Sequence, residues 1–260
     1  MSNLLFKIIA FVVILLTGFI GGFFCIKLTA SSKREKIFSL GNAFAGGIFL
    51  GAGLIHMLPD AQEGFDSFLA GVDFPWVSLI CALGFLLVLF IEKVLFTSHD
   101  AIAEAEGKQP GKLLYPYILT LVLSVHSIIA GIALGTEGKI MKGVIILIAV
   151  LAHKGSAAFA LGVSLVRAEI LKSKIKRIIT LFCFTTPLGL VIGSLFIILM
   201  TGKTELVVTS IFDALAAGTF LYVALLDILN EEFKVVKDRF IKFVLVLLGL
   251  GLMALLAIWV

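Results

Sequence analysis

The sequence predicts an all-α polytopic membrane protein with eight transmembrane helices and both termini outside. Its composition is 60% hydrophobic and 15% charged, with a mean hydropathy of +1.17. Soluble domains are nearer to about 45–50% apolar and about 25% charged. The apolar residues also form long uninterrupted runs. Connections with many Lys and Arg residues alternate with connections that have few. We therefore expect one transmembrane domain over residues 1–260, embedded in a lipid bilayer.

Polar breaks divide the chain into apolar runs that can each cross a hydrocarbon layer of about 30 Å as a helix. The first run is not a signal peptide, because no small-residue cleavage site closes it and basic residues follow it. The predicted spans are 4–26, 38–58, 75–96, 115–135, 140–166, 177–201, 206–229 and 240–259.

The basic residues are distributed unequally between the two sides of these spans. The connections one–two, three–four, five–six and seven–eight hold 16 Lys and Arg, whereas the termini and the other connections hold 4. Cytoplasmic loops carry the excess of Lys and Arg, so the first set is predicted to be cytoplasmic. Both termini then lie outside. The remaining basic residue, Lys154, falls inside a span.

Three of the four histidines lie where a membrane protein rarely has them. His56, His126 and His153 fall within or at the end of the second, fourth and fifth predicted spans, and only His99 lies in a connection. Ionisable groups at membrane depth are costly and usually face a polar interior. A lone histidine there is more often structural, but three together favour metal ligation, because neutral imidazole binds Zn²⁺ and neighbouring first-row ions.

Other polar residues stand near these histidines. Asp60 follows His56 by four residues, so the two share a helix face if the helix continues past Pro59, which can instead end or kink it. Asp60 is therefore a further candidate metal ligand. Ser127 offers a hydroxyl beside His126. The outer connection after the second span holds acidic residues and no basic one, which suits a mouth that attracts cations or ordinary solvated charge. These residues are Asp60, Glu63, Asp66 and Asp73.

Lys154 is the least expected residue, because a lysine at mid-span cannot easily reach water. Two explanations remain open. It forms a salt bridge to an acid of the seventh span, or its charge lies beside an ion site and excludes a second cation. The candidate acids are Asp213, Asp227 and Glu231. The last two lie near the inner end of that span, where they suit either a cation exit or the membrane surface.

Small residues recur around these positions at four-residue spacing, which lets neighbouring helices approach closely. Examples are Gly47 with Gly51 and Gly131 with Gly135. Such packing needs no ion, but it would bring side chains from different spans within reach of one.

Four segments together resemble the ZIP family of divalent metal transporters. They are GIFLGAGLIHMLPDA (47–61), HSIIAGIALG (126–135), HKGSAAFALG (153–162) and AAGTFLYVALLDIL (216–229). The resemblance implies a zinc or iron(II) uptake protein with the metal held between the fourth and fifth spans, where His126 and His153 match the family's histidine positions. It also implies alternating access by an elevator-like or rocking movement, and a homodimer.

The chain departs from the family pattern at the site. Ala130 stands where many members have glutamate, Ala157 stands where some members do, and Lys154 stands where a two-metal member has an acidic ligand. We therefore expect a mononuclear site of His56, His126 and His153, completed by Ser127 or water. His56 lies about 30 Å of helix beyond Lys36, near the outer surface. The connection 97–114 has only His99, so no histidine-rich metal-sensing loop is expected.

The expected function is the movement of Zn²⁺, with Fe²⁺ and other first-row ions as alternatives, into the cytoplasm across a plasma or bacterial inner membrane. The metal is then the substrate, and no resident cofactor, nucleic-acid partner or enzymatic activity is expected. ATP does not drive it, since TGKT at 201–204 lacks the first P-loop glycine. The alternatives are an intramembrane zinc-dependent hydrolase, against which the absence of H-E-x-x-H speaks, and a metal-gated sensor.

Overall fold

The computed structural model describes residues 3–28, 33–68, 74–95, 115–199 and 203–258. Within these ranges, eight helical stretches are long and apolar enough to cross a membrane, which confirms the all-helical class and the span number. The side on which the termini lie stays a prediction. His99 and Asp73 lie outside the described residues. The elements are α1 (Asn3–Leu28), α2 (Arg34–Gly51), η1 (Ala52–Met57), α3 (Leu58–Phe68), α4 (Trp76–Phe90), η2 (Ile91–Leu95), α6 (Tyr115–Thr136), α7 (Ile140–Arg167), α8 (Lys172–Leu199), α9 (Lys203–Tyr222), η3 (Val223–Leu229), α10 (Asn230–Lys234) and α11 (Arg239–Leu256).

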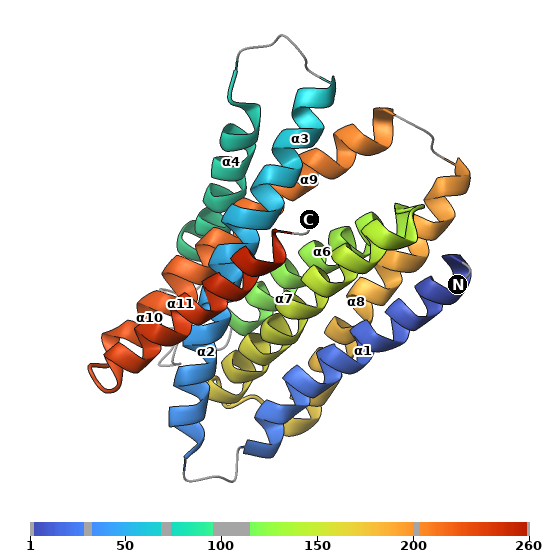
Figure 1. The fold of residues 1–260 in the computed structure, drawn as a ribbon. Helices are drawn as coiled ribbons and strands as arrows, with labels where there is room; N and C mark the ends of the chain where they lie inside the picture. The colour runs from blue at the N-terminus through green and yellow to red at the C-terminus, as the bar shows by residue number, and fades with distance from the viewer. Residues whose placement is uncertain (1–2, 29–32, 69–73, 96–114, 200–202, 259–260) are drawn as a thin grey trace.

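One end of the molecule gathers the short turns between α7 and α8 and between α10 and α11, together with the start of α2 (Figure 1). We call it the basic end, because Arg34, Lys172 and Arg239 begin the helices there. α1 begins and α11 ends at the opposite end. The basic end is the one that the distribution of Lys and Arg predicts to be cytoplasmic.

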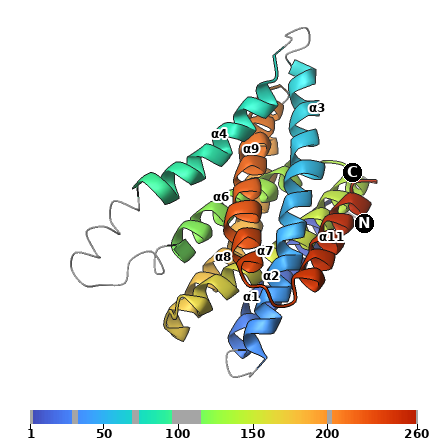
Figure 2. The ribbon, with the colours of Figure 1, turned by 90° about the vertical axis from the view of Figure 1, so that its left-hand side faces the viewer.

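The second span is longer than predicted. It runs to Phe68 instead of ending near residue 58, and Figure 2 shows α2, η1 and α3 as one continuous rod. The π-helical segment η1 lies directly before Pro59. Proline lacks the N–H that continues an α-helical ladder, and a π-helical turn re-spaces that ladder without ending the helix. Pro59 therefore neither ends the span nor separates His56 from Asp60.

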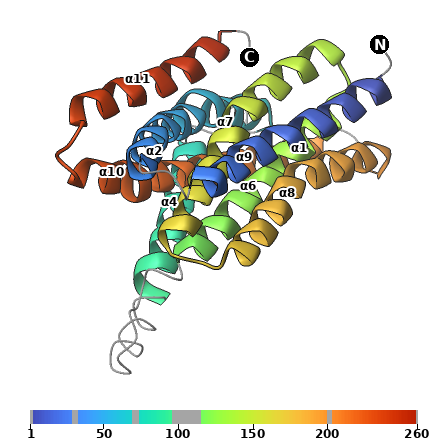
Figure 3. The same cartoon turned by 90° about the horizontal axis from the view of Figure 1, so that it is seen from below.

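The helices form two groups. α1, α6, α7 and α8 pack mainly with one another and are called group A, whereas α2, α3, α4, α9, α10 and α11, with the three π-helical segments, are called group B. Figure 3 shows α2, α10 and α11 on one side and α1, α6 and α8 on the other. The groups meet chiefly where α2 packs on α7 and where α6 packs on α9.

Glycines bring helices within each group into backbone contact, as their four-residue spacing predicts. A Cβ on Gly131 of α6 would lie 2.2 Å from the carbonyl oxygen of Thr186, and one on Gly189 of α8 would lie 2.1 Å from that of Ile128. In group B, a Cβ on Gly47 of α2 would lie 2.1 Å from the carbonyl oxygen of Val246. α6 carries His126, so its close packing on α8 fixes the depth of one candidate ligand.

Replacing Gly131 by alanine is therefore expected to lower the free energy of unfolding by about 1–3 kcal/mol, the usual cost of overpacking. The measurement is thermal unfolding of the purified protein in detergent. Gly251→Ala is the matched control, because a Cβ at Gly251 in α11 meets nothing within 4 Å. Equal melting temperatures for the two variants would contradict the close approach of α6 and α8.

Group B contains an internal repeat that runs in opposite directions through the membrane. AGGIFLGAGLIHML at 45–58 and AAGTFLYVALLDIL at 216–229 share alanine, glycine, phenylalanine and leucine at matching positions. Each segment passes from an α-helix into a π-helical stretch, η1 or η3. The matched phenylalanines, Phe49 and Phe220, pack with ring centroids 5.0 Å apart. Inverted repeats of this kind are common in secondary transporters. His56 and Asp227 thus occupy equivalent positions in the two segments.

Candidate metal site

The structure brings together the two histidines of the fourth and fifth spans. Nε2 of His126 in α6 lies 3.4 Å from Nε2 of His153 in α7. The residues are 5% and 4% exposed. The ring of Phe220 from α9 lies against both, with centroids 4.1 Å from His126 and 6.0 Å from His153. Two imidazoles of group A therefore face each other, enclosed by an aromatic side chain of group B.

The separation of these nitrogens has a chemical meaning. A tetrahedral Zn²⁺ binds imidazole nitrogen at about 2.0–2.1 Å, which places two such ligands about 3.3–3.4 Å apart. The observed 3.4 Å agrees with that value, and it is also at the long end for an N–H···N hydrogen bond. Nδ1 of His126 is buried and meets no hydrogen-bond partner among the described residues. The pair therefore offers two nitrogen ligands at zinc spacing without any rearrangement of the rings.

The amine of Lys154 is held by hydroxyl and backbone carbonyl oxygens, and not by a carboxylate. Its Nζ donates hydrogen bonds to Ser127 Oγ at 3.1 Å, to the Phe182 carbonyl at 2.9 Å and to Thr185 Oγ1 at 3.2 Å. Nζ also lies 3.7 Å from the centroid of the Phe182 ring. Three acceptors suffice for the three donors of an ammonium, so the residue is satisfied although only 1% exposed.

This arrangement answers two questions left open by the sequence. Among the described residues, no ion pair joins Lys154 to Asp213, Asp227 or Glu231. Ser127, proposed from the sequence to complete the metal shell, instead accepts a hydrogen bond from Lys154. Lys154 therefore forms part of α7's contact with α6 and α8, directly beside the histidine pair.

His56 lies within electrostatic range of both histidines but does not join them in a cluster. In the part of the chain that the structure describes, no group of three or more His, Cys, Asp or Glu is close enough to hold a metal ion. The three-histidine cluster is therefore not formed in this structure. His56 Nδ1 lies instead 3.1 Å from Asp60 Oδ2, with the side chains 13% and 41% exposed. The shared helix face is thus confirmed, and it forms a separate polar pair toward the end opposite the basic end.

A cavity of about 520 Å³ opens between the two groups toward the basic end. α7 of group A contributes Ser164 and Arg167 to its wall, and α2 of group B contributes Asn42. Four carboxylates also line it, namely Glu92, Asp227, Glu231 and Glu232. The sequence suggested Asp227 and Glu231 for a cation exit, and both lie here. Asp213 lies on α9, half-buried and outside this lining.

Sequence reasoning missed several residues of this cavity. Glu92 lies inside the predicted third span, and Asn42 is a polar amide within the second. Both are visible as exceptions in apolar runs, and that signal would have found them. Glu232 gives no such signal, because it follows another glutamate at a span end and resembles a surface charge, yet it is only 3% exposed.

Comparison with known proteins finds similarity along nearly the whole chain. A family model described as ZIP Zinc transporter matches residues 4–114 and 98–257. Zinc transporter ZIP1 of Bos taurus is 29% identical over 257 residues, covering 86% of this chain and 79% of the relative. Zinc transporter ZIP1 of Mus musculus is 30% identical with the same coverage. Fe(2+) transport protein 1 of Arabidopsis thaliana is 27% identical over 295 residues, covering 97% of this chain and 85% of the relative.

Proposed function

Because the chain belongs to the ZIP zinc transporter family, a family of transporters and not of enzymes, we propose that it carries Zn²⁺ into the cytoplasm through a site at His126 and His153. The single observation that carries this assignment is the 3.4 Å contact between the two Nε2 atoms. Zinc-dependent hydrolysis, the alternative from the sequence, is not proposed, because the members of this family are transporters. Fe²⁺ is a second substrate, supported by similarity to a relative named for Fe(2+) transport.

The small number of protein ligands suits transport. A carrier must bind its ion strongly enough to select it and weakly enough to release it. Two imidazoles leave two positions of a tetrahedral ion for water, which exchanges as the ion enters and leaves. Lys154 adds positive charge beside the pair, so one divalent ion is favoured over two. This supports a mononuclear site, as expected from the sequence, but one made by His126 and His153 without the His56 that the sequence also placed in it.

Polar groups on both sides of the pair suit a path for a cation. The His56–Asp60 pair lies toward one end, and the cavity with its four carboxylates opens toward the basic end. The excess of Lys and Arg at the basic end supports its placement in the cytoplasm, so the cavity would be the exit. Three of these carboxylates pair with Lys93, Arg167 and Lys234 of the same lining. Asp227 has no ion pair among the described residues, so it would lower the cost of moving a partly dehydrated cation back to water.

The division into two groups supports alternating access. Both histidines belong to group A, whereas Phe220, which covers them, belongs to group B. A displacement of group A along group B would carry the ion from one side of Phe220 toward the other without breaking the histidine pair. No ATP is needed, since the ion gradient supplies the free energy.

The test is uptake of Zn²⁺ into proteoliposomes that enclose a zinc-sensitive dye, without ATP. We expect saturable uptake that Fe²⁺ reduces by competition, with protein-free liposomes as the control. A panel of Mn²⁺, Cd²⁺ and Fe²⁺ then ranks the substrates. Tight Zn²⁺ binding by the purified protein without any flux would instead favour the metal-gated sensor.

A further inference from the structure

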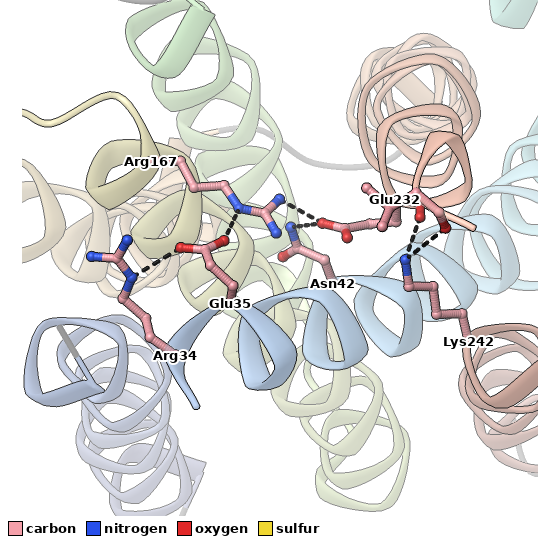
Figure 4. Close-up of polar contacts among 7 residues, drawn as sticks. Arg34, Glu35, Asn42, Arg167, Glu232 and Lys242 are labelled. Carbon is pink, nitrogen blue, oxygen red and sulfur yellow. Dashed lines mark hydrogen bonds and ion pairs between the residues drawn. The ribbon is translucent and has the colours of Figure 1, made fainter. Parts of the chain in front are cut away.

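One arginine joins the two helix groups at the basic end. Arg167 ends α7 of group A, and its Nη1 donates to Glu232 Oε1 of group B at 2.6 Å. Its Nε donates to Glu35 Oε2, at the start of α2, at 3.4 Å. Figure 4 shows the guanidinium between these two carboxylates. The guanidinium group of Arg167 thus contacts two separate segments of group B.

Glu232 is fixed within group B by contacts of its own. The same Oε1 accepts a hydrogen bond from Asn42 Nδ2 at 2.9 Å, and its backbone oxygen accepts one from Lys242 Nζ (Figure 4). Its side chain is 4% exposed. A buried carboxylate that loses its cation is strongly destabilised, so this pair is costly to open.

Two neighbouring ion pairs of the basic end stay within group B. Arg34 pairs with Glu35 on α2, and Lys36 of α2 pairs with Asp238 beside α11. Elsewhere the surface between the groups includes α2 packed on α7, and the buried residues of both helices are mostly small and apolar. Arg167 differs because its ion pairs cross that surface.

We propose that Arg167 is a positioning residue for transport, whose ion pair with Glu232 holds the two groups in the arrangement that opens the cavity at the basic end. Both residues lie in the wall of that cavity. A displacement of one group by a few ångströms would break a contact of 2.6 Å, because its two atoms belong to different groups. The pair therefore stabilises this arrangement over its alternative. The inference rests on the proposed transport by relative movement of the groups.

Measuring the distance between the two groups tests whether Arg167 holds them in one arrangement. Spin labels are attached to cysteines placed at Lys172 on group A and Lys237 on group B, both exposed, after Cys25, Cys81 and Cys183 are replaced by alanine. Without metal, we expect the labelled parent to give one main distance. Arg167→Gln is expected to raise a second, discrete population at least about 5-fold, as a coupling of ordinary strength would.

Arg34→Gln is the matched control, since it removes an arginine that shares Glu35 but does not cross between the groups. It should leave the distances unchanged. Glu232→Gln, which keeps the size and hydrogen bonding of the side chain, should repeat the effect of Arg167→Gln, and Arg167→Lys should restore part of the parent distribution. In uptake assays, Arg167→Gln should change Vmax with KM unchanged, because it touches no metal ligand.

The outcomes separate this inference from the proposed function. An unchanged distance distribution in Arg167→Gln with normal Zn²⁺ uptake overturns the positioning role and leaves transport intact. A second population without Zn²⁺ uptake by the parent protein overturns transport and not the coupling of the groups. A broad, featureless distribution together with a lowered melting temperature would mean that Arg167 only maintains the fold, which also overturns the inference.

Discussion

Replacing either His126 or His153 by alanine is expected to lower Zn²⁺ uptake into proteoliposomes by at least about 10–100-fold, the range already seen when only an outer-shell partner of a metal ligand is removed. The reason is geometric. The two Nε2 atoms lie 3.4 Å apart at zinc spacing, and the protein places no third His, Cys, Asp or Glu of the described residues with them. Losing one imidazole therefore halves the number of protein ligands to the ion.

His56→Ala is the informative comparison, because it removes the same side chain from a different place. We expect it to retain most of the uptake, since His56 pairs with Asp60 and not with the other histidines. A loss as large as that of His153→Ala would restore the three-histidine site that the sequence predicts, formed in another arrangement of the groups. Uptake at the parent rate by both His126→Ala and His153→Ala would show that this pair does not bind the ion.

The fold was largely predictable, because the bilayer imposes one simple requirement on every span. A helix must stay apolar over about 30 Å, so span number follows from composition along the chain. The prediction was wrong at the end of the second span, where hydropathy falls after Leu58 but the helix continues to Phe68. Polar residues at 60–66 end the apolar run without ending the hydrogen-bond ladder, and local sequence does not distinguish these two events.

The candidate site was predictable in part, for a related reason. Histidines inside apolar runs are expensive, so their presence alone indicates a role. Their partners were harder to predict, because spacing along one helix says nothing about which neighbour lies opposite. Lys154 illustrates this, since its acceptors lie on α6 and α8 and include a backbone carbonyl. The repeat that matches His56 with Asp227 was present in the sequence and needed only a comparison of the chain with itself.

Replacing Lys154 by methionine is expected to raise the apparent affinity for Zn²⁺, lowering KM by on the order of tenfold, which corresponds to about 1.4 kcal/mol. An ammonium and a divalent ion repel each other, and at a buried position this repulsion is worth more than the roughly 1 kcal/mol found for unit charges in water. Methionine fills a similar volume without the charge. Because a more tightly held ion leaves more slowly, Vmax should fall as KM falls.

The variant must be compared with one that removes a lysine elsewhere on the same helix. Lys142→Met serves, since Lys142 lies exposed in the first turn of α7, far from the histidine pair. Initial uptake rates over a range of Zn²⁺ concentrations give KM and Vmax for each protein. A KM that stays at the parent value in Lys154→Met would mean that the amine carries no charge beside the ion, and a KM that rises would mean that it helps to bind the substrate. Either result would remove the electrostatic argument for a single bound ion, because that argument needs a fixed positive charge next to the two imidazoles.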